Sequence, residues 1–441
     1  MTKAIFALLV FFGCFYGYYS STVTFGISIS TKAPSGFLNQ NGKQVLAGLE
    51  YFVKKANTWN IAINNKTDSL TFAIKSMEDY GNSTIVKQNY QTMIADPTIN
   101  FFLGPVSSPL SAAAKSITEP AGRLLLGTKV GSASFYTGAE YSYSVTTSPP
   151  RYATTTFPEF RINGIRKIVL VVEQTPFQID IGKGFVENAE DFSIEIVEQF
   201  NVLTDTINGI GSAFEKNISD VASIIRSMDL ANGEDNHVFD AVVIASFTNV
   251  GKYFLNFTRQ MDYTPKAIYI SSFYVPDFLA LDPSLVAFVS GCDVIAPGIN
   301  FRGSHIGTYN DFLADFDATM PASDGPADAN QAIGAVSGLL LMLAIQSADS
   351  LDTNEVTRAL GRVNEDTFFG PFQFGADHSQ LRFVPFLQFI PNKEEWVDYA
   401  KSLVSNYTSV VNIVGPSRVQ LVSCVKKKIN LQTLKIAKSK F

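Results

Sequence analysis

Two serines at the predicted start of a helix are the residues best placed to hold a charged ligand. The strand-like segment 101–104 ends at Gly-Pro-Val, and Ser107 and Ser108 then open a segment with helical periodicity. Backbone N–H groups and hydroxyls at a helix N-terminus attract a carboxylate or a phosphate. Simple N-capping by one hydroxyl is the more common use of serine at this position, so these residues alone leave both interpretations open.

A loop of small residues follows the next predicted strand. The apolar run 123–126 leads through Gly127 into Val130, Gly131 and Ser132. Residues this small let the backbone approach a bound ligand closely, and consecutive N–H groups can surround an anion. An ordinary loop at the end of a strand has the same composition and is the alternative interpretation.

The residues that would indicate catalysis are scattered along the chain. The three histidines are His237, His305 and His378, and their spacing is not that of a metal site. Walker loops, nucleophile elbows and complete dinucleotide fingerprints are missing from the sequence. The adjacent acids at 78–79 and 394–395 are expected to be solvated. We therefore expect no enzymatic activity, no metal and no cofactor, while a grouping of residues in space keeps a secreted α/β hydrolase as an alternative.

The composition of the chain narrows the class of partner, and the order of its predicted elements indicates the fold that positions these candidate residues. The chain has 441 residues and a formal net charge of −6, which argues against a nucleic-acid partner. Strand-like and helix-like segments alternate, which predicts parallel sheets with right-handed crossovers. The first unit has predicted strands at 23–29, 70–75 and 101–104 and helices at 43–55, 83–95 and 107–119. The second unit has strands at 167–172, 194–199, 241–245 and 267–270, with helices at 185–192, 212–228 and 250–261.

The remaining elements complete two lobes. A strand is predicted within 286–296, helices at 308–316, 330–347 and 354–362, and a β-rich piece at 383–389. No long flexible linker separates the two units, so several short connections should form a hinge. The apolar run 332–345 is too short to span a membrane comfortably and should be buried inside one lobe.

The chain ends suggest a secreted protein. Residues 1–21 combine an early lysine, an apolar run and a polar end, which is typical of a signal peptide, although a buried first helix or an uncleaved anchor has a similar pattern. Cys292 and Cys424 would then remain, either as a pair or as separate thiols. The basic tail near the C-terminus is expected to be disordered or to contact an acidic surface. Glycosylation acceptors occur at Asn65, Asn82, Asn217, Asn256 and Asn406.

With these pieces in order, the chain resembles the type I periplasmic binding proteins, and most of all the branched-chain amino-acid binding proteins and related ligand-binding regions of extracellular receptors. The resemblance covers 23–391 and depends on the Ser35-Gly36 loop, the segment 104–108, the late helix 335–345 and the segment 369–374. It implies an α/β fold of two doubly wound parallel-sheet lobes joined by several hinge crossings. The implied division is a signal peptide at 1–21, lobe 1 at 22–148 and 299–371, lobe 2 at 149–298 and 372–400, and a C-terminal extension at 401–441.

The resemblance also implies a ligand site between the lobes. The serine matching Ser108, with Ser107 beside it, would bind the carboxylate of the ligand, and the loop of Val130, Gly131 and Ser132 would contact its carboxylate and amino group. The remaining positions implied to lie near the ligand are Asn41 in the first lobe and Phe177, Phe247 and Phe273 in the second.

Two departures from the family pattern bear on the identity of the ligand. Phe273, or Tyr274 if the alignment shifts by one, stands where the amino-acid binders carry an acid, and Asp277 replaces that acid only if its loop bends. The late helix opens with Ile333-Gly334 in place of the usual Tyr-Asp. Because an unpaired buried ammonium is costly, a carboxylate or amide with an apolar body fits these residues at least as well as an amino acid.

We therefore expect a secreted protein, or a periplasmic one in a bacterium, that closes on an amino acid or a related carboxylate. Its implied partners are this small-molecule ligand and a membrane transporter or a signalling receptor. The oligomeric state stays open and includes a dimer through lobe 1. A ligand-independent ectodomain with a degenerate site is the second hypothesis, ahead of the hydrolase.

Overall fold

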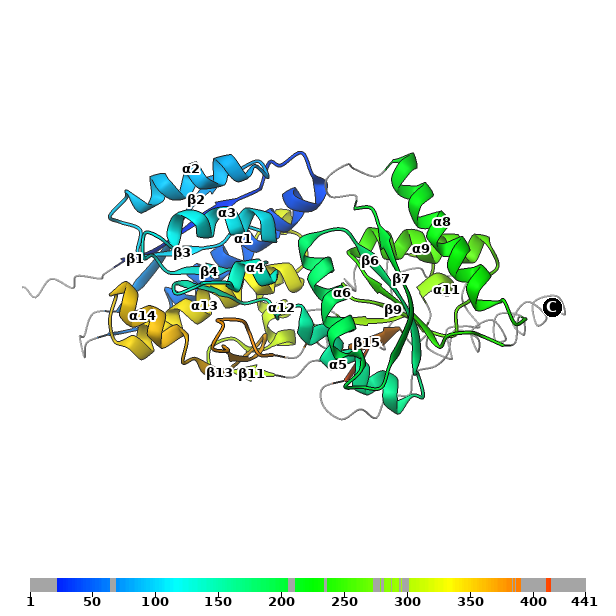
Figure 1. The fold of residues 1–441 in the computed structure, drawn as a ribbon. Helices are drawn as coiled ribbons and strands as arrows, with labels where there is room; N and C mark the ends of the chain where they lie inside the picture. Colours follow the sequence, from blue (N-terminus) through cyan, green and yellow to red (C-terminus); the bar gives the residue numbers. More distant parts are fainter. Residues whose placement is uncertain are drawn as a thin grey trace, which may run out of the picture.

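The protein folds into two α/β lobes that lie side by side, each built on its own sheet (Figure 1). The computed structural model describes residues 22–63, 69–204, 211–233, 236–272, 278, 281–286, 288–292, 295, 301–382, 384, 386–389 and 410–413. The predicted signal peptide, the basic tail, Cys424, Asn65, Asn406, Phe273, Tyr274 and Asp277 lie outside the described residues.

Lobe 1 contains a parallel sheet with the strand order β2-β1-β3-β4-β5. Its strands are β1 (Thr22–Ile29), β2 (Thr71–Glu78), β3 (Phe101–Leu103), β4 (Leu125–Gly127) and β5 (Ser142–Ser144). Its first helices are α1 (Gly36–Ala56), α2 (Ser83–Ile94), α3 (Ser108–Thr118) and the short α4 (Ala133–Tyr136). Alternation along β3 separates the two faces, because Phe101 and Leu103 join the core on one side while Phe102 packs with α2 and α3 on the other.

The C-terminal part of the chain returns to lobe 1. It forms the hairpins β11–β12 (Arg302–Gly303 and Gly307–Thr308) and β13–β14 (Asn364–Thr367 and Gly370–Gln373), the 3-10 turn η1 (Ala322–Asp324), and helices α12 (Tyr309–Thr319), α13 (Ala329–Ala348) and α14 (Thr353–Leu360). Among the described residues, α13 is the one helix whose length and composition would suit a membrane span, but most of it is buried in the protein core. The prediction of a buried helix over 332–345 is confirmed.

Helices α1 and α13 pack with their backbones in close contact. A Cβ at Gly48 would collide with the carbonyl of Gln331, and a Cβ at Gly334 would collide with the carbonyl of Val45. Glycine is required where two backbones approach this closely. Gly334 is one of the predicted departures from the pattern of the binding proteins that the chain resembles, and this contact gives the departure a physical reason.

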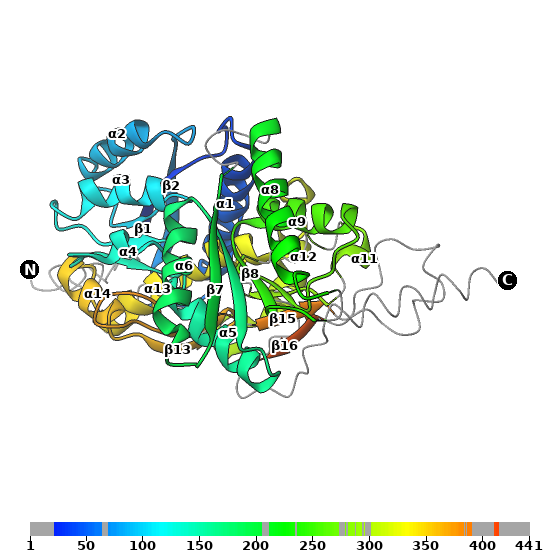
Figure 2. The same ribbon diagram turned by 45° about the vertical axis from the view of Figure 1, so that its right-hand side comes forward.

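Lobe 2 contains a sheet with the order β16-β15-β10-β9-β8-β6-β7, in which β15 and β16 lie at the opposite edge from β7 (Figure 2). The parallel strands are β6 (Lys167–Glu173), β7 (Glu195–Val202), β8 (Ala241–Ala245), β9 (Ile268–Ile270) and β10 (Ser290–Cys292), and the antiparallel strands are β15 (Phe386–Phe389) and β16 (Val410–Ile413). Helices α5 (Pro150–Ile162) and α6 (Pro176–Ala189) cover one face, α8 (Ser212–Asp229) and α9 (Thr248–Gln260) cover the other, and the short α11 (Pro283–Val286) contacts α9.

Across the part of the chain that the structure describes, the elements change lobe three times: after β5, between β10 and β11, and between β14 and β15. Two of these crossings touch, because Thr147 and Gln380 form a parallel β-bridge. Arg382 fixes the last crossing to lobe 1 through a hydrogen bond to the carbonyl of Phe369, whose ring lies 4.4 Å from the guanidinium. The predicted fold of two doubly wound parallel-sheet lobes joined by several crossings is confirmed.

Several local expectations were wrong or incomplete. Helix α1 begins seven residues before the predicted 43–55, at Gly36, where Ser35 caps it, and α5 was not predicted at all. Asp79 is not solvated but fully buried, and it accepts hydrogen bonds from Ser28 and Ser30. Burial raises the pKa of the Asp79 carboxyl, and the hydrogen bonds only partly offset this effect.

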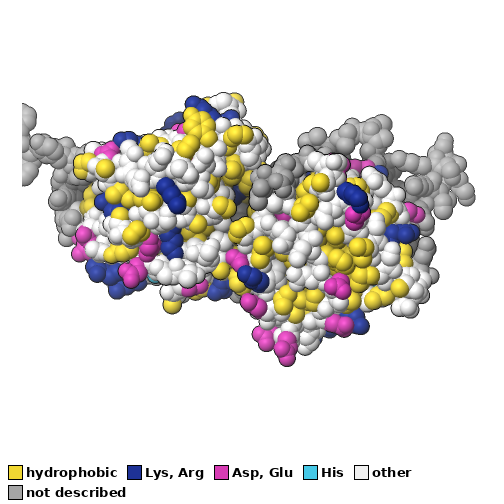
Figure 3. Space-filling view, turned by 45° about the horizontal axis from the view of Figure 1, so that its top comes forward, with side chains coloured by type: hydrophobic (Ala, Val, Ile, Leu, Met, Phe, Trp, Pro, Cys, Tyr) yellow, Lys and Arg dark blue, Asp and Glu magenta, His cyan; other side chains and the backbone are white. Residues whose placement is uncertain are grey.

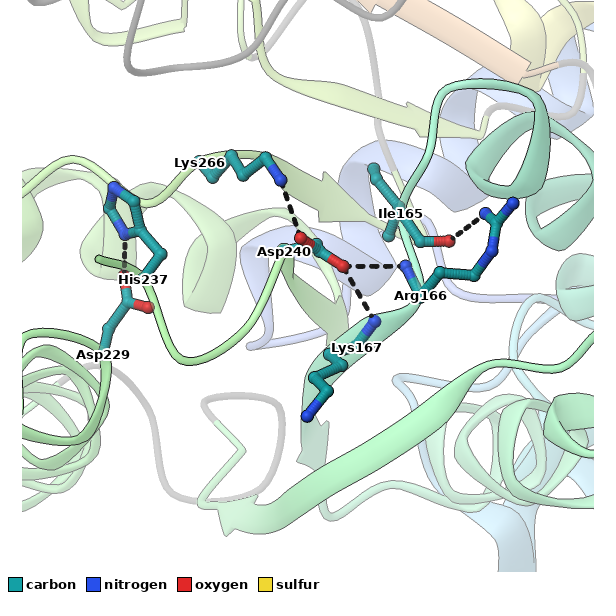
Figure 4. Close-up of polar contacts among 7 residues, drawn as sticks. All are labelled: Ile165, Arg166, Lys167, Asp229, His237, Asp240 and Lys266. Atoms are coloured by element: carbon teal, nitrogen blue, oxygen red, sulfur yellow. Dashed lines mark hydrogen bonds and ion pairs between the residues drawn. The ribbon is translucent and has the colours of Figure 1, made fainter. Parts of the chain in front are cut away.

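The amino-terminal edge of the lobe 2 sheet is held together by one carboxylate. Asp240 accepts hydrogen bonds from the backbone N–H groups of Arg166 and Lys167 and from the ammonium of Lys266, at 2.8, 3.0 and 2.7 Å (Figure 4). Nearby, His237 lies 2.6 Å from the buried Asp229. These contacts connect the starts of three strands, so this edge has a structural role.

Candidate ligand-binding site

The start of α3 has an unusual backbone. Ser107, the N-cap residue, has φ +100° and ψ 148°, a conformation that non-glycine residues rarely adopt. Its side chain makes no capping hydrogen bond, while Ser108 is 8% exposed. Of the two interpretations of these serines, N-capping by the Ser107 hydroxyl is therefore not what the structure shows. A residue held in such a conformation indicates that the surrounding structure requires it.

The loop after β4 runs beside this helix start. The N–H of Ser107 donates to the carbonyl of Lys129 at 3.2 Å, and Val106 and Lys129 form a parallel β-bridge. Val130 is buried against α2 and α3, and its carbonyl accepts a hydrogen bond of 2.5 Å from the Ser144 hydroxyl. The structure thus places Ser107 next to the predicted loop, although the Val130 carbonyl is already engaged within lobe 1.

The same loop contacts lobe 2. Gly131 packs so closely against Phe177 that a Cβ would collide with the ring, and the N–H of Ala133 donates to Asp180 of α6 at 2.8 Å. Ser132, which is 1% exposed, lies between them in sequence, and its hydroxyl is 3.2 Å from that of Ser134. The loop 129–133 is therefore part of the boundary between the lobes.

Three phenylalanines meet across this boundary. Phe37, in the first turn of α1, lies 5.6 Å from Phe247 of lobe 2, and Phe247 stacks on Phe177 at 6.1 Å with an interplanar angle of 13°. Phe177 and Phe247 were predicted near the ligand, and the structure brings them together. Phe37 was missed, although one exposed aromatic residue at a helix start gives little signal in a sequence.

Strand order explains why these residues converge. In lobe 1 the order reverses between β1 and β3, and α1 and α3 leave the sheet on opposite faces there. In lobe 2 it reverses between β6 and β8, which lead to Phe177 and Phe247. Ligands of open α/β sheets bind at the carboxyl ends of the strands at such reversal points. Both reversal points lie at the same boundary.

Lys129 is the functional candidate that sequence reasoning missed. Its ammonium donates to the side-chain carbonyls of Asn41 and Asn330, both at 2.6 Å, and lies 5.9 Å from the centre of the Phe37 ring. Asn41, which was predicted near the ligand, is 7% exposed and holds this lysine. A lysine among small residues in a loop usually projects into solvent, so its sequence position alone would not have revealed the contact.

The lobe 2 side of the boundary carries polar groups behind the rings. Phe247 is the N-cap of α9, and its N–H donates to the fully buried Glu173 at 2.7 Å. Gln178, at the start of α6, donates to Ser272 at 2.9 Å and accepts from Ser271 at 3.0 Å. These bonds fix the starts of α6 and α9, which present Phe177 and Phe247.

The three histidines lie in other contacts. His305 stacks on Trp59 at 4.8 Å, His378 stacks on Tyr143 at 4.0 Å, and His237 pairs with Asp229. The hydrolase alternative called for a histidine close to a serine in the cleft, where it could act as a general base. The contacts of these histidines are thus with Trp59, Tyr143 and Asp229.

The space-filling view shows the two lobes meeting at a narrowed waist, with acidic and basic side chains scattered over the visible face (Figure 3). The face has no single-sign patch of the kind that recruits nucleic acid.

Comparisons with known proteins agree with this architecture. Among solved structures, a leucine-binding protein from Thermotoga maritima has a TM-score of 0.65 at 13% identity, with 83% of this chain and 95% of that chain covered. A branched-chain amino acid transporter substrate-binding protein from Streptococcus pneumoniae, in complex with isoleucine, has a TM-score of 0.63 at 16% identity, covering 84% and 96%. A solute-binding protein from R. palustris, in complex with benzoate, has a TM-score of 0.63 at 13% identity, covering 83% and 93%.

These structures share the fold with the chain at low sequence identity. A sequence model described as "Periplasmic binding protein" matches residues 22–389, which is most of the chain. The resemblance predicted from the ordered motifs is thereby confirmed, and the chain belongs to the periplasmic binding protein family.

Proposed function

We propose that this chain binds a small organic ligand carrying a carboxylate between its two lobes and releases it unchanged. The observation that carries the proposal is the convergence at one boundary of the α3 start, the loop 129–133 and the rings of Phe177 and Phe247. Polar groups on one lobe and aromatic rings on the other are the usual composition of a small-molecule site. The family membership and the ligands present in the similar structures support it.

Within this proposal Ser107 and Ser108 hold the carboxylate. A helix of 11 residues starts there, and the hydroxyl of its N-cap residue makes no capping bond. The N–H groups of Gly131 and Ser132 are the second set of donors, and Phe177 and Phe247 cover the apolar part of the ligand. Val130 fixes the conformation of the loop, since its carbonyl accepts a hydrogen bond from the Ser144 hydroxyl.

The proposal includes a secretory route and a partner. Residues 1–21 would be removed as a signal peptide, and the exposed Asn82 and Asn256 would be accessible for glycosylation, whereas Asn217 is partly buried and accepts a hydrogen bond from the backbone of Leu203. The closed form would deliver its ligand to a membrane transporter or report it to a signalling receptor. In this proposal lobe 1 comprises 22–148 and the segment from 299 through β14 (Gly370–Gln373), two residues past the predicted limit of 371, and lobe 2 comprises 149–298 and the segment from β15 (Phe386–Phe389) to 400.

Thermal unfolding against a panel of amino acids and small carboxylates tests this function. Ligand at a hundred times its Kd stabilises a protein by about 2.7 kcal/mol, so a true ligand should raise Tm by several degrees. Ser108→Ala should abolish the shift, whereas Ser116→Ala, an exposed serine at the other end of the same helix, should retain it. Unchanged Tm with every compound at millimolar concentration would rule the proposal out.

A second candidate function is a ligand-independent ectodomain. The specific observation in its favour is that Phe37 contacts Phe247 and Gly131 contacts Phe177, so protein side chains already meet across the boundary. In that case, the lobes would stay together without a ligand, and Ser108→Ala would change neither stability nor any binding property.

A further inference from the structure

Helix α6 of lobe 2 lies beside lobe 1 and reaches the loop 129–133 through two side chains one turn apart (Figure 1). Phe177 packs against Gly131, where a Cβ would collide with the ring, and the carboxylate of Asp180 accepts the N–H of Ala133 at 2.8 Å. Residues three apart on a helix are neighbours on its surface, so one face of α6 carries both contacts. The ring fits the loop by shape, and Asp180 adds a charge-assisted hydrogen bond.

Each partner of this hydrogen bond is fixed within its own lobe. Ala133 begins the short helix α4, and the ammonium of Lys115 holds the other end of α4 by donating to the carbonyl of Phe135 at 2.7 Å. On the other side, a Cβ at Gly184 would collide with Pro150, so α6 packs closely against the backbone at the start of α5. Because each partner is held by its own lobe, the hydrogen bond breaks when the lobes separate.

The two oxygens of the Asp180 carboxylate have separate partners. Oδ2 accepts the N–H of Ala133, and Oδ1 lies 3.3 Å from the ammonium of Lys183, one turn further along α6. The side chain of Asp180 is 14% exposed and that of Lys183 is 64% exposed. The carboxylate is thus mostly covered, although Ala133 is exposed and the bond lies at the rim of the boundary. The exposed ion pair with Lys183 should contribute little.

Contacts between the lobes are made by protein groups on both sides. Among the described residues, the pairs that meet across the boundary include Phe37 with Phe247, Gly131 with Phe177, and Ala133 with Asp180. Such pairs favour the closed arrangement, in which the lobes touch, in the free and in the liganded protein alike. A contact that favours closure equally in both states changes how often the lobes open and leaves the affinity for ligand unchanged.

We propose that Asp180 is an interlobe latch, which sets the rates at which the ligand enters and leaves the site without setting its affinity. The inference rests on the proposed function, because it describes how access to that site is regulated. Entry and release both require the lobes to part, and the bond between Ala133 and Asp180 breaks each time. Asp180 is a positioning residue in this account, since it holds the loop 129–133 against α6 and does not touch the ligand.

The reactivity of a buried thiol tests the latch in the protein without added ligand. Ser132, which is 1% exposed, is replaced in a Ser132→Cys background, and alkylation by iodoacetamide is followed by mass spectrometry. Adding Asp180→Ala should raise the alkylation rate by about fivefold, an amount consistent with one charge-assisted hydrogen bond at a partly exposed site. Cys292, which is fully buried in lobe 2, is the internal reference and should react no faster. An unchanged rate at position 132 overturns the latch.

The rates of ligand binding provide the second test. Isothermal titration with isoleucine and with benzoate, which are bound in two of the similar structures, gives Kd from the heats and both rates from the shape of the heat pulses. Asp180→Ala should raise both rates by about fivefold and keep Kd within about twofold. A rise in Kd that comes from the release rate alone overturns the latch, because Asp180 would then act only on the liganded state. If no compound of the thermal panel binds, the proposed function fails, while the thiol experiment still decides whether the latch exists.

Two further variants of α6 separate the interlobe bond from other effects of the substitution. Asp180→Asn keeps an acceptor oxygen without the charge and should raise the alkylation and binding rates by only about twofold. Lys183→Met removes the exposed ion pair with Asp180 and should leave these rates unchanged. Rates in Lys183→Met as high as those in Asp180→Ala would show that the surface of α6, and not the bond to Ala133, controls opening, and would overturn the latch.

Discussion

The ring of Phe37 in lobe 1 lies 5.6 Å from the ring of Phe247 in lobe 2, and this contact connects the starts of α1 and α9. Phe247 also stacks on Phe177, so it is the central ring of the three. An aromatic pair contributes about 0.5–1.5 kcal/mol beyond the area it buries. The contact between the two lobes should therefore depend on Phe247.

Phe247→Ala should weaken ligand binding by about tenfold, because the ring that covers the apolar body is lost. Titration calorimetry with whichever carboxylate binds best measures the effect. Phe257→Ala is the matched control, since Phe257 is a half-buried ring on the same helix that contacts Tyr253 instead. Equal losses in the two variants would contradict a role for Phe247 at the site.

Ser107→Gly should separate stability from binding. At φ +100° and ψ 148° a serine is strained by about 1–3 kcal/mol, and glycine adopts this conformation freely. Glycine also raises the conformational entropy of the unfolded chain, which offsets part of this relief. The variant should therefore be more stable by about 1 kcal/mol, and it should bind ligand more weakly because the hydroxyl is lost.

Urea unfolding and titration of the same samples check this prediction. Ser132→Gly is the control, because Ser132 has an ordinary extended backbone at φ −62° and ψ 141° and should only lose stability on substitution. A Ser107→Gly protein that is destabilised as much as the control would show that the Ser107 conformation is not strained.

Gly131→Ala should hold the lobes apart. The added methyl group would overlap the ring of Phe177, while the strand pairing inside each lobe is not touched by it. Solution scattering should show a larger radius of gyration, and ligand affinity should fall by more than about tenfold. Gly36→Ala places a methyl group where no atom lies within 4 Å and should match the wild type in both measurements.

Much of the fold could be read from the sequence because its elements carry strong local patterns. The strands β6 and β8 are buried on both faces, so their apolar runs are continuous, and α8 buries Phe214, Ile218 and Val221 at helical spacing. Helix α5 was missed because Pro158 lies inside it and Pro150 opens it. Its buried Phe157 and Phe160 pack against the sheet of lobe 2. The stability gained from this packing outweighs the low helix propensity of proline.

The candidate site was only partly predictable because its contacts are long-range. Ser107, Ser108 and the loop 130–132 follow strands directly, so the position of the strand ends was enough to find them. Lys129 is separated by 88 residues from Asn41 and by 201 residues from Asn330. The local sequence pattern does not indicate partners at such separations. The burial of Asp79 against Ser28 and Ser30 was not predicted for the same reason.

Gly334→Ala should damage lobe 1 severely. A Cβ at this position would overlap the carbonyl of Val45 in α1, and neither backbone can move without disturbing the helix pair. Overpacking of a core costs about 1–3 kcal/mol when side chains can adjust, so a loss of about 3 kcal/mol or more is expected in urea unfolding. Gly211→Ala, with no atom within 4 Å at the start of α8, should lose less than 1 kcal/mol.

Asp240 should make stability depend on pH in the acid range. Burial raises its pKa, but the ammonium of Lys266 and the N–H groups of Arg166 and Lys167 outweigh this effect and hold the pKa below its ordinary value (Figure 4). A carboxyl whose folded-state pKa is lowered adds stability above its unfolded pKa of about 3.9, and this stability is lost as the pH falls through the folded-state value.

Asp240→Asn should therefore cost about 1 kcal/mol at neutral pH, a figure reduced for the partial exposure of the group, and this difference from wild type should shrink below about pH 4. Urea midpoints measured between about pH 2 and pH 7 provide the test. Asp220→Asn is the control, because its ion pair with Lys216 is exposed on both sides, at 56% and 74%, and should contribute little at any pH. A constant difference between Asp240→Asn and wild type across this range would mean that the carboxylate charge is not what stabilises the strand starts.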